Sequence, residues 1–145
     1  MTTRNSERGA AMIEAAIMTP ILLLLMVGIF EVGRAYETWQ VLTNAAREGA
    51  RISVLPNSDV NTTEALVRQY MTNGQLSRAG DAPVGVDKNA SLTVNGTTFG
   101  ASLVTVDYPF QFMVLQPVAQ MIVPGTTTGS AITMRATALM RNESP

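Results

Sequence analysis

The hydrophobic positions of this chain form one uninterrupted run, then a helical periodicity, then short alternations. The run extends from Ala15 to Phe30, which are sixteen residues without a charge. Counting back through Glu14 to Ala10 gives twenty-one residues, and a transmembrane helix needs about 20. The run therefore predicts a membrane span over residues 10–30, if the span accepts Glu14.

A secretory signal peptide that is removed after export is the alternative for such a run. The run is long for a signal region, and no small-x-small cleavage site with a following break comes after Phe30. Ahead of the run, residues 1–8 carry Arg4 and Arg8 against Glu7. This positive bias predicts a single pass with the N-terminus in the cytoplasm and the C-terminal part outside.

Helical periodicity continues from Phe30 to about Val54, and Pro56 ends it because the residue before a proline avoids the α region. Larger or apolar positions recur at steps of four and three, which marks one face of a helix. That face consists of Val32, Tyr36, Trp39, Thr43, Ala46, Ala50 and Ser53. A helix over residues 10–54 is about 68 Å long at 1.5 Å per residue, about twice the thickness of a bilayer. Residues 31–54 are therefore expected to project from the membrane.

The roles of two groups of residues in the projecting half can each be interpreted in two ways. Tyr36 and Trp39 lie where interfacial aromatic residues are common, and packing under the head is at least as good an explanation. A group of small residues permits close backbone approach and consists of Ala45, Ala46, Gly49 and Ala50. They pack either on the helix of another subunit or on the protein's own sheet. We favour the sheet, because the helix must cover the core of the head.

After Pro56 the pattern predicts a second, short helix. Asn61 is a candidate N-cap with Glu64 three residues later, as in a capping box. Asn73-Gly74 then ends this helix. Residues 75–89, with Gly and Pro, read as a loop.

The last third of the chain predicts strands. Apolar and polar residues alternate over residues 90–94, 104–114 and 132–141. Asn95-Gly96 is a turn signal, Pro109 marks an edge or a bulge, and residues 115–129 read as a long loop. The prediction is an α+β fold, in which a long N-terminal transmembrane and stalk helix packs on a small antiparallel β-sheet head with one extra short helix. The head would take up residues 55–145.

Composition narrows the function classes. Net charge is −1 and only 14% of residues are charged, and there is no basic patch with interleaved aromatics, which argues against a nucleic-acid partner. Cysteine and histidine are absent, which removes the common nucleophile–base pairs, disulfides and most zinc sites. Lys88 is the only lysine and lies in a turn-like context, and the Gly-Thr-Thr-Thr-Gly stretch at 125–129 lacks the lysine of a phosphate loop. We expect no enzyme, no metal, no cofactor and no small-molecule substrate.

The N-terminal third also resembles a known family. The motifs are Arg8-Gly9-Ala10-Ala11-Met12-Ile13-Glu14-Ala15-Ala16, then Gly28-Ile29-Phe30-Glu31-Val32-Gly33-Arg34, then Leu42-Thr43-Asn44-Ala45-Ala46-Arg47-Glu48-Gly49-Ala50-Arg51. In this order and spacing they resemble TadE-like proteins, which are minor pilins or pseudopilins of the tight-adherence (Flp) type IV pilus system. The close match covers residues 8–51. Many relatives carry an aromatic residue where Ala15 stands, which separates the chain from a major pilin more than from the TadE group.

The resemblance implies processing and partners. A prepilin peptidase would cut between Gly9 and Ala10, so that residues 1–9 are a cytoplasmic leader and the mature chain has 136 residues. Glu14 would be the fifth mature residue and would set assembly and register. The implied partners are the membrane, the peptidase, other pilin subunits and the pilus assembly machinery. The implied place is the inner membrane, followed by incorporation into a surface pilus.

The position of Glu14 has a physical rationale. An unpaired carboxylate within lipid costs on the order of 2.5–3.5 kcal/mol. The new ammonium at Ala10 would lie about one helical turn away, and in a pilus this group of one subunit can pair with Glu14 of a neighbour. The alternative is that Glu14 reaches the cytoplasmic interface as a solvated charge. With the family pattern, pairing is favoured.

These observations predict a structural minor pilin that takes part in pilus assembly and cell adhesion. The alternatives are a permanently anchored extracytoplasmic adaptor, which keeps residues 1–9 and is not polymerised, and a pseudopilin of a type II secretion system.

Overall fold

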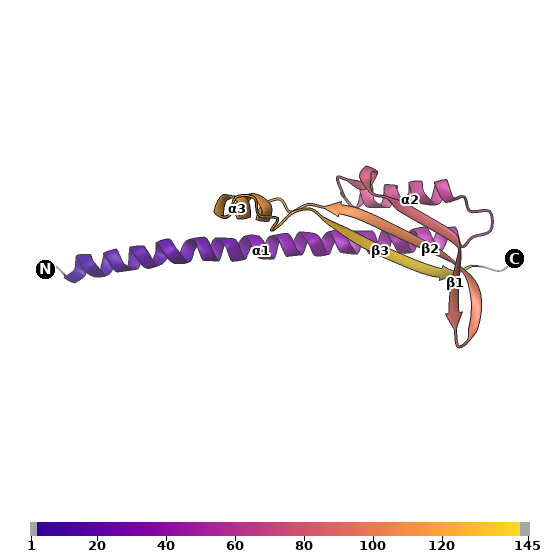
Figure 1. Cartoon of the computed structure of the whole chain (residues 1–145), viewed down its shortest axis with the longest axis horizontal. Coiled ribbons are helices and arrows are strands. Elements are labelled where there is room, and N and C mark those ends of the chain that lie inside the picture. The colour runs from indigo at the N-terminus through magenta and orange to yellow at the C-terminus, as the bar shows by residue number, and fades with distance from the viewer. Residues whose placement is uncertain (1–2, 143–145) are drawn as a thin grey trace. The chain divides into compact units, whose positions relative to one another are not determined.

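The computed structural model describes residues 3–142 and contains three α-helices, one 3-10 helix and three strands over that range (Figure 1). In chain order they are α1 (Thr3–Ser53), α2 (Val60–Asn73), the 3-10 helix η1 (Ala79–Asp81), β1 (Val84–Val94), β2 (Thr97–Phe110), α3 (Leu115–Ile122) and β3 (Ile132–Arg141). The predicted α+β class, with a long N-terminal helix and a small antiparallel sheet, is confirmed. The helix α1 begins ahead of the predicted start, inside the expected leader.

The chain divides by its internal contacts into two units. Residues 1–34 and 112–129 form the first, called the stalk unit, and residues 35–111 and 130–145 form the second, called the head unit. The sequence-based division into residues 1–9, 10–30, 31–54 and 55–145 rests on the membrane and on processing, and it stays a prediction. Residues 1–2 of the predicted leader and residues 143–145 of the predicted head lie outside the described part of the chain.

The sheet of the head unit is an antiparallel meander in the order β1-β2-β3. The expected turn at Asn95-Gly96 joins β1 to β2, and both residues have positive φ, 51° and 81°. Two successive positive values are those of a type I′ hairpin turn, which matches the right-handed twist of the strands. The predicted antiparallel sheet is therefore confirmed together with its turn.

The first strand is longer than its alternation predicted. The strand begins at Val84. The prediction of a loop over residues 75–89 is therefore wrong for residues 84–89, which belong to β1. A register shift between Asp87 and Ala90 interrupts the pairing with β2. There the amide of Asn89 donates to Asp87 Oδ1 at 2.9 Å. The turn-like sequence around Lys88 is thus a bulge within a strand, because local side-chain bonding replaces one step of the ladder.

The second strand is shifted towards the N-terminus relative to the prediction of 104–114. It ends at Phe110, so the alternation at Phe112 and Val114 did not mark a strand. Pairing with β1 ends at Val84↔Val106, while Pro109 pairs with Thr133 of β3. Pro109 therefore has a neighbouring strand on one side, where a missing N–H is tolerated. The edge reading of this proline is confirmed.

Two helices differ from their predictions. The N-cap of α2 is Asp59 and not Asn61, since Asp59 Oδ2 accepts the amide of Thr62 at 3.2 Å. The stretch 115–129 is not all loop, because α3 occupies its first eight residues. Pro117 falls in the first turn of α3, where a helix needs no N–H from it.

The core of the head unit is built where α1 and α2 meet the sheet. Leu42, Val67, Met71, Val104 and Val106 are fully buried there. The buried face of α1 agrees with the predicted face only in its last turns. Tyr36 and Trp39 are 63% and 45% exposed, so their reading as core residues is wrong.

Candidate functional site

The predicted processing site lies on exposed helix. Gly9 and Ala10 are both exposed, and the bond between them lies inside α1. Glu14 is exposed as well. Four residues of helix separate Ala10 from Glu14 by about 6 Å along the axis. The Gly9–Ala10 bond and the side chain of Glu14 are therefore both accessible on the surface of α1.

The first half of α1 has the properties of a membrane span. It is long and apolar enough to cross a bilayer, and none of its most apolar stretch is buried by the protein. Its large apolar side chains are largely exposed, from Met12 at 74% to Leu24 at 46%. A helix on the surface of a water-soluble protein turns its apolar side chains towards the core and buries them there. This stretch instead shows apolar side chains on all sides, as a helix solvated by lipid does.

A buried carboxylate lies immediately after the span. Glu31 is 1% exposed, and its Oε1 atom accepts the backbone amides of Met113 at 2.7 Å and Val114 at 2.6 Å. Its Oε2 atom accepts from the guanidinium of Arg34 at 3.0 Å. Arg34 lies three residues further along the same helix, whereas the two amides come from a segment 82 and 83 residues away. Glu31 thus ties the start of α3 to α1 within the stalk unit.

These partners decide the charge state of Glu31. Burial on its own raises the pKa of the carboxyl group, while hydrogen bonds from Val114, Arg34 and Met113 lower it. The balance holds the pKa of Glu31 below its ordinary value of 4.5. A carboxylate that accepts several hydrogen bonds is stabilised in its charged form. Glu31 is therefore ionised at neutral pH, and its tie to α3 is charge-assisted.

The small residues near the end of α1 lie inside the head unit. Ala45, Ala46, Gly49 and Ala50 are all buried. A Cβ atom placed on Gly49 would come within 2.5 Å of Val67 on α2 and 3.3 Å of Val104 on β2. In this fold the four residues face the protein's own helix and sheet, which is the arrangement favoured above. Their small size lets α1 approach both elements closely.

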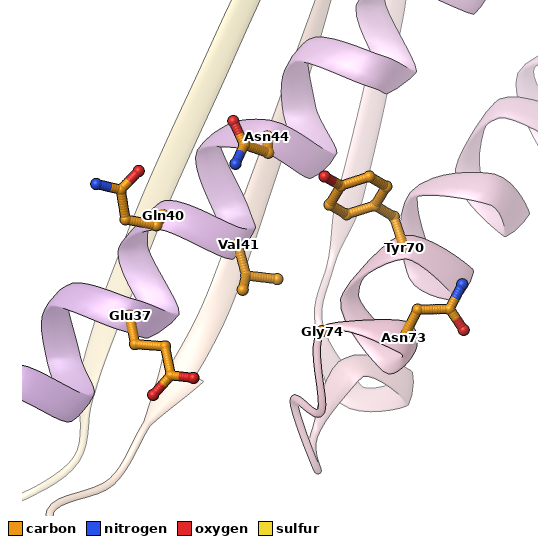
Figure 2. A pocket seen from close by; sticks show the side chains of 7 residues that line it. All are labelled: Glu37, Gln40, Val41, Asn44, Tyr70, Asn73 and Gly74. Atoms are coloured by element: carbon orange, nitrogen blue, oxygen red, sulfur yellow. The ribbon is translucent and has the colours of Figure 1, made fainter.

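An open cleft lies between α1 and α2 in the head unit (Figure 2). It has a volume of about 370 Å³ and is lined by Glu37, Gln40, Val41, Asn44, Tyr70, Asn73 and Gly74. Figure 2 shows the ring of Tyr70 extending from α2 towards α1. The lining offers one carboxylate, three amides and a phenol, and none of its seven residues carries a positive charge that could pair with Glu37.

Acidic side chains and the single lysine are two further groups with the chemistry of a binding site. Among the described residues no three side chains of His, Cys, Asp or Glu gather as metal ligands. The single lysine, Lys88, donates to the carbonyl and hydroxyl oxygens of Ser58, both at 2.7 Å. It fastens the loop after α1 to the bulge of β1. Its role in the fold is therefore that of a tie between distant segments.

Comparison with known proteins agrees with the motifs in α1. Residues 9–51 match the model of a family described as TadE-like protein. This segment is TadE-like. The match supports a TadE-like protein of the tight-adherence system and suggests involvement in its pilus. Searches of curated proteins and of solved structures gave no match.

Sequence reasoning missed the role of Glu31 in the TadE-like segment. It did not identify the amides of Met113 and Val114, which donate to the carboxylate of Glu31. A backbone amide leaves no residue-type signal, so composition and spacing do not reveal such a partner. The only hint was the position of a carboxylate directly after an apolar run, where an unpaired charge is costly.

Proposed function

We propose that this protein is a minor pilin of a tight-adherence pilus, which is held in the inner membrane by α1, cut after Gly9 and then assembled with other pilin subunits. The observation that carries this proposal is the uninterrupted helix α1, which is exposed and apolar through residues 10–30 with Glu14 as its one charged residue there. The TadE-like match over the same helix supports it. The work of the protein is then assembly, without catalytic turnover.

Glu14 supplies the reason for assembly. A carboxylate on a lipid-facing helix costs free energy until it finds a partner. Removal of residues 1–9 creates an ammonium group at Ala10, and the same helix of a neighbouring subunit can bring that group to Glu14. One cut thus provides both the cation and the register in which two helices pack. In this proposal the leader is cytoplasmic and the head lies outside, as the positive charge of residues 1–8 predicts.

Intact mass of the protein extracted from membranes of the native host tests the processing step. In a host with an active prepilin peptidase, the expected mass is that of a chain that begins at Ala10. A matched Gly9→Leu variant should keep residues 1–9, since a branched side chain at the scissile bond obstructs the protease. Wild-type protein that carries only an N-terminus at Met1 would favour the anchored adaptor instead.

A charge test addresses assembly. The Glu14→Ala variant should be processed but fail to co-purify with pilus subunits and fail to reach the sheared pilus fraction. Glu37→Ala is the matched control, because Glu37 is exposed on the same helix beyond the span. Assembly of Glu14→Ala at wild-type levels would contradict the pairing.

The type II secretion alternative differs only in partners. The proteins that cross-link to the head in intact cells distinguish it from the tight-adherence assignment. Recovery of secretion-system pseudopilins in place of pilus subunits would support that alternative.

A further inference from the structure

We propose that the segment from Phe112 to Val123, which contains α3, lies in the outer interface of the bilayer as a second membrane contact of the stalk unit. This inference rests on the membrane span of the proposed function but not on cleavage or polymerisation. The occupant of the surface is lipid at the boundary of headgroups and acyl chains.

The exposed side of this segment is apolar. Met113, Met121 and Val123 are 64%, 84% and 58% exposed, and Pro117 is exposed between them. Pro117 and Met121 are four residues apart and share one face of α3, and Met113 and Val123 flank the helix at its two ends. No charged residue occurs between Asp107 and Arg135. An outward face of this kind is unusual in water, and it suits a helix that lies in a membrane interface.

The position of the segment is fixed by Glu31. This residue follows Phe30, the last residue of the predicted span, and its carboxylate holds the amides of Met113 and Val114. The start of α3 therefore lies at the level where α1 leaves the hydrocarbon layer. An interfacial helix buries its apolar face about 5–10 Å into the headgroup and acyl boundary. The tie places α3 at the depth that its surface requires.

The backbone of the segment is also prepared for a poorly hydrated environment. A helix N-terminus exposes amides that water normally satisfies, and lipid cannot. Here Glu31 accepts two amides just ahead of α3, and Pro117 has no amide in its first turn. Both features lower the cost of moving the start of α3 out of water. They also explain why a carboxylate is buried in a unit that buries so little else.

The absence of cysteine from the chain allows a direct test with single labels. Met121→Cys reports on α3, Leu24→Cys on the span, and Val94→Cys on the β1–β2 hairpin. Leu24 and Val94 are matched in exposure at 46% and 47%. Each full-length variant carries an environment-sensitive fluorophore and is reconstituted into phosphatidylcholine–phosphatidylglycerol vesicles. Quenching is measured with aqueous iodide and with lipids that carry a nitroxide near the headgroup or deep in the chain.

The label at residue 121 should be shielded from iodide and quenched most by the shallow nitroxide. The label at 24 should respond to the deep nitroxide, and the label at 94 to iodide. Iodide quenching at 121 equal to that at 94 would overturn the inference. Shielding of 121 only in assembled pili, and not in vesicles, would also overturn it and assign the surface to a neighbouring subunit. Failure of the label at 24 to be shielded would instead contradict the membrane span itself.

A second variant tests the tie. Glu31→Ala in the Met121→Cys background removes the acceptor and should weaken quenching by the shallow nitroxide, while Glu37→Ala should leave it unchanged. An unchanged depth profile for Glu31→Ala would show that Glu31 does not position α3. In the wild-type background, shallow quenching at 121 would still support the interfacial contact.

Discussion

The head unit and the stalk unit bury opposite kinds of side chain. In the head unit the core is apolar, with Leu42, Met71, Val104 and their neighbours removed from water. In the stalk unit, among residues 8–34 and 112–129 apart from residue 122, Glu31 is the one buried side chain, while leucines, isoleucines and methionines are exposed. A single solvent cannot favour both arrangements. The helix α1 exposes an apolar stretch long enough to cross a membrane, whereas the head buries its apolar side chains within itself.

The difference extends to how each unit holds together. Close packing stabilises the head, where small residues of α1 allow contact with β2 and α2. A charge-assisted set of hydrogen bonds around Glu31 joins the two segments of the stalk unit. The hydrophobic effect does not drive contact between protein surfaces in lipid, where van der Waals packing and hydrogen bonds act instead. The two units should therefore respond to different substitutions.

The largest effect is expected from Gly49→Leu in the head unit. A Cβ atom would already meet Val67 at 2.5 Å, and the stiff branched side chain of Val67 cannot move aside in a packed core. We expect a loss of about 3 kcal/mol in the free energy of unfolding, at the upper end of overpacking costs. Chemical denaturation of the full-length protein in detergent, followed by the fluorescence of Trp39, measures it. Gly33→Leu is the control, since open space surrounds Gly33. Equal stability of the two variants would contradict the close packing of α1.

The next effect is expected from Glu31→Ala in the stalk unit. The substitution leaves two backbone amides and Arg34 without this acceptor, and a hydrogen bond to a charged group contributes about 1.5–3 kcal/mol. Hydrogen exchange at the amides of Met113 and Val114 should accelerate, while exchange in the head should not change. Glu31→Gln, which keeps an acceptor oxygen, should lie between wild type and Glu31→Ala. Exchange that is slow in all three proteins would show that the tie does not hold α3.

Low pH should weaken the hydrogen bonds that the amides of Met113 and Val114 donate to Glu31. The pKa of Glu31 is below its ordinary value of 4.5, so the charged form contributes stability that is fully present above that value. This contribution is lost as pH falls through the lowered pKa, because the protonated group no longer accepts in the same way. Exchange at Met113 and Val114, corrected for intrinsic rates, should stay constant from neutral pH down to 4.5 and accelerate only in stronger acid. Acceleration already near neutral pH would indicate a raised pKa.

The smallest effect is expected from Gly96→Ala at the hairpin. Gly96 has φ of 81°, and a side chain in this region costs about 1 kcal/mol. Gly100→Ala is the control, since its Cβ would make only an ordinary contact with Asn142 at 3.5 Å. Thermal unfolding followed by circular dichroism compares the two variants. A larger loss for Gly100→Ala would contradict the type I′ turn.

Several elements were predictable because their signals are local. The apolar run gave the first half of α1, the Asn95-Gly96 pair gave the hairpin turn, and the alternation from Ile132 to Arg141 gave β3. The errors have local causes too. The N-cap of α2 was predicted at Asn61 because the sequence there fits a capping box. In the structure the N-cap is Asp59, two residues earlier. The alternation through Phe112 and Val114 resembled a strand, and the Pro117 region resembled a loop.

By itself the sequence determined that a helix long enough to span a bilayer leads into a strand-rich head. Hydrophobic periodicity and turn residues are signals that depend only on residues close together in the chain. The sequence also carried the TadE-like motifs. Only the tertiary structure decided that Ala45, Ala46, Gly49 and Ala50 face the protein's own core, and that Glu31 binds the amides ahead of α3. Such pairings join residues far apart in the chain, and the partners of Glu31 are backbone groups that every residue except proline carries.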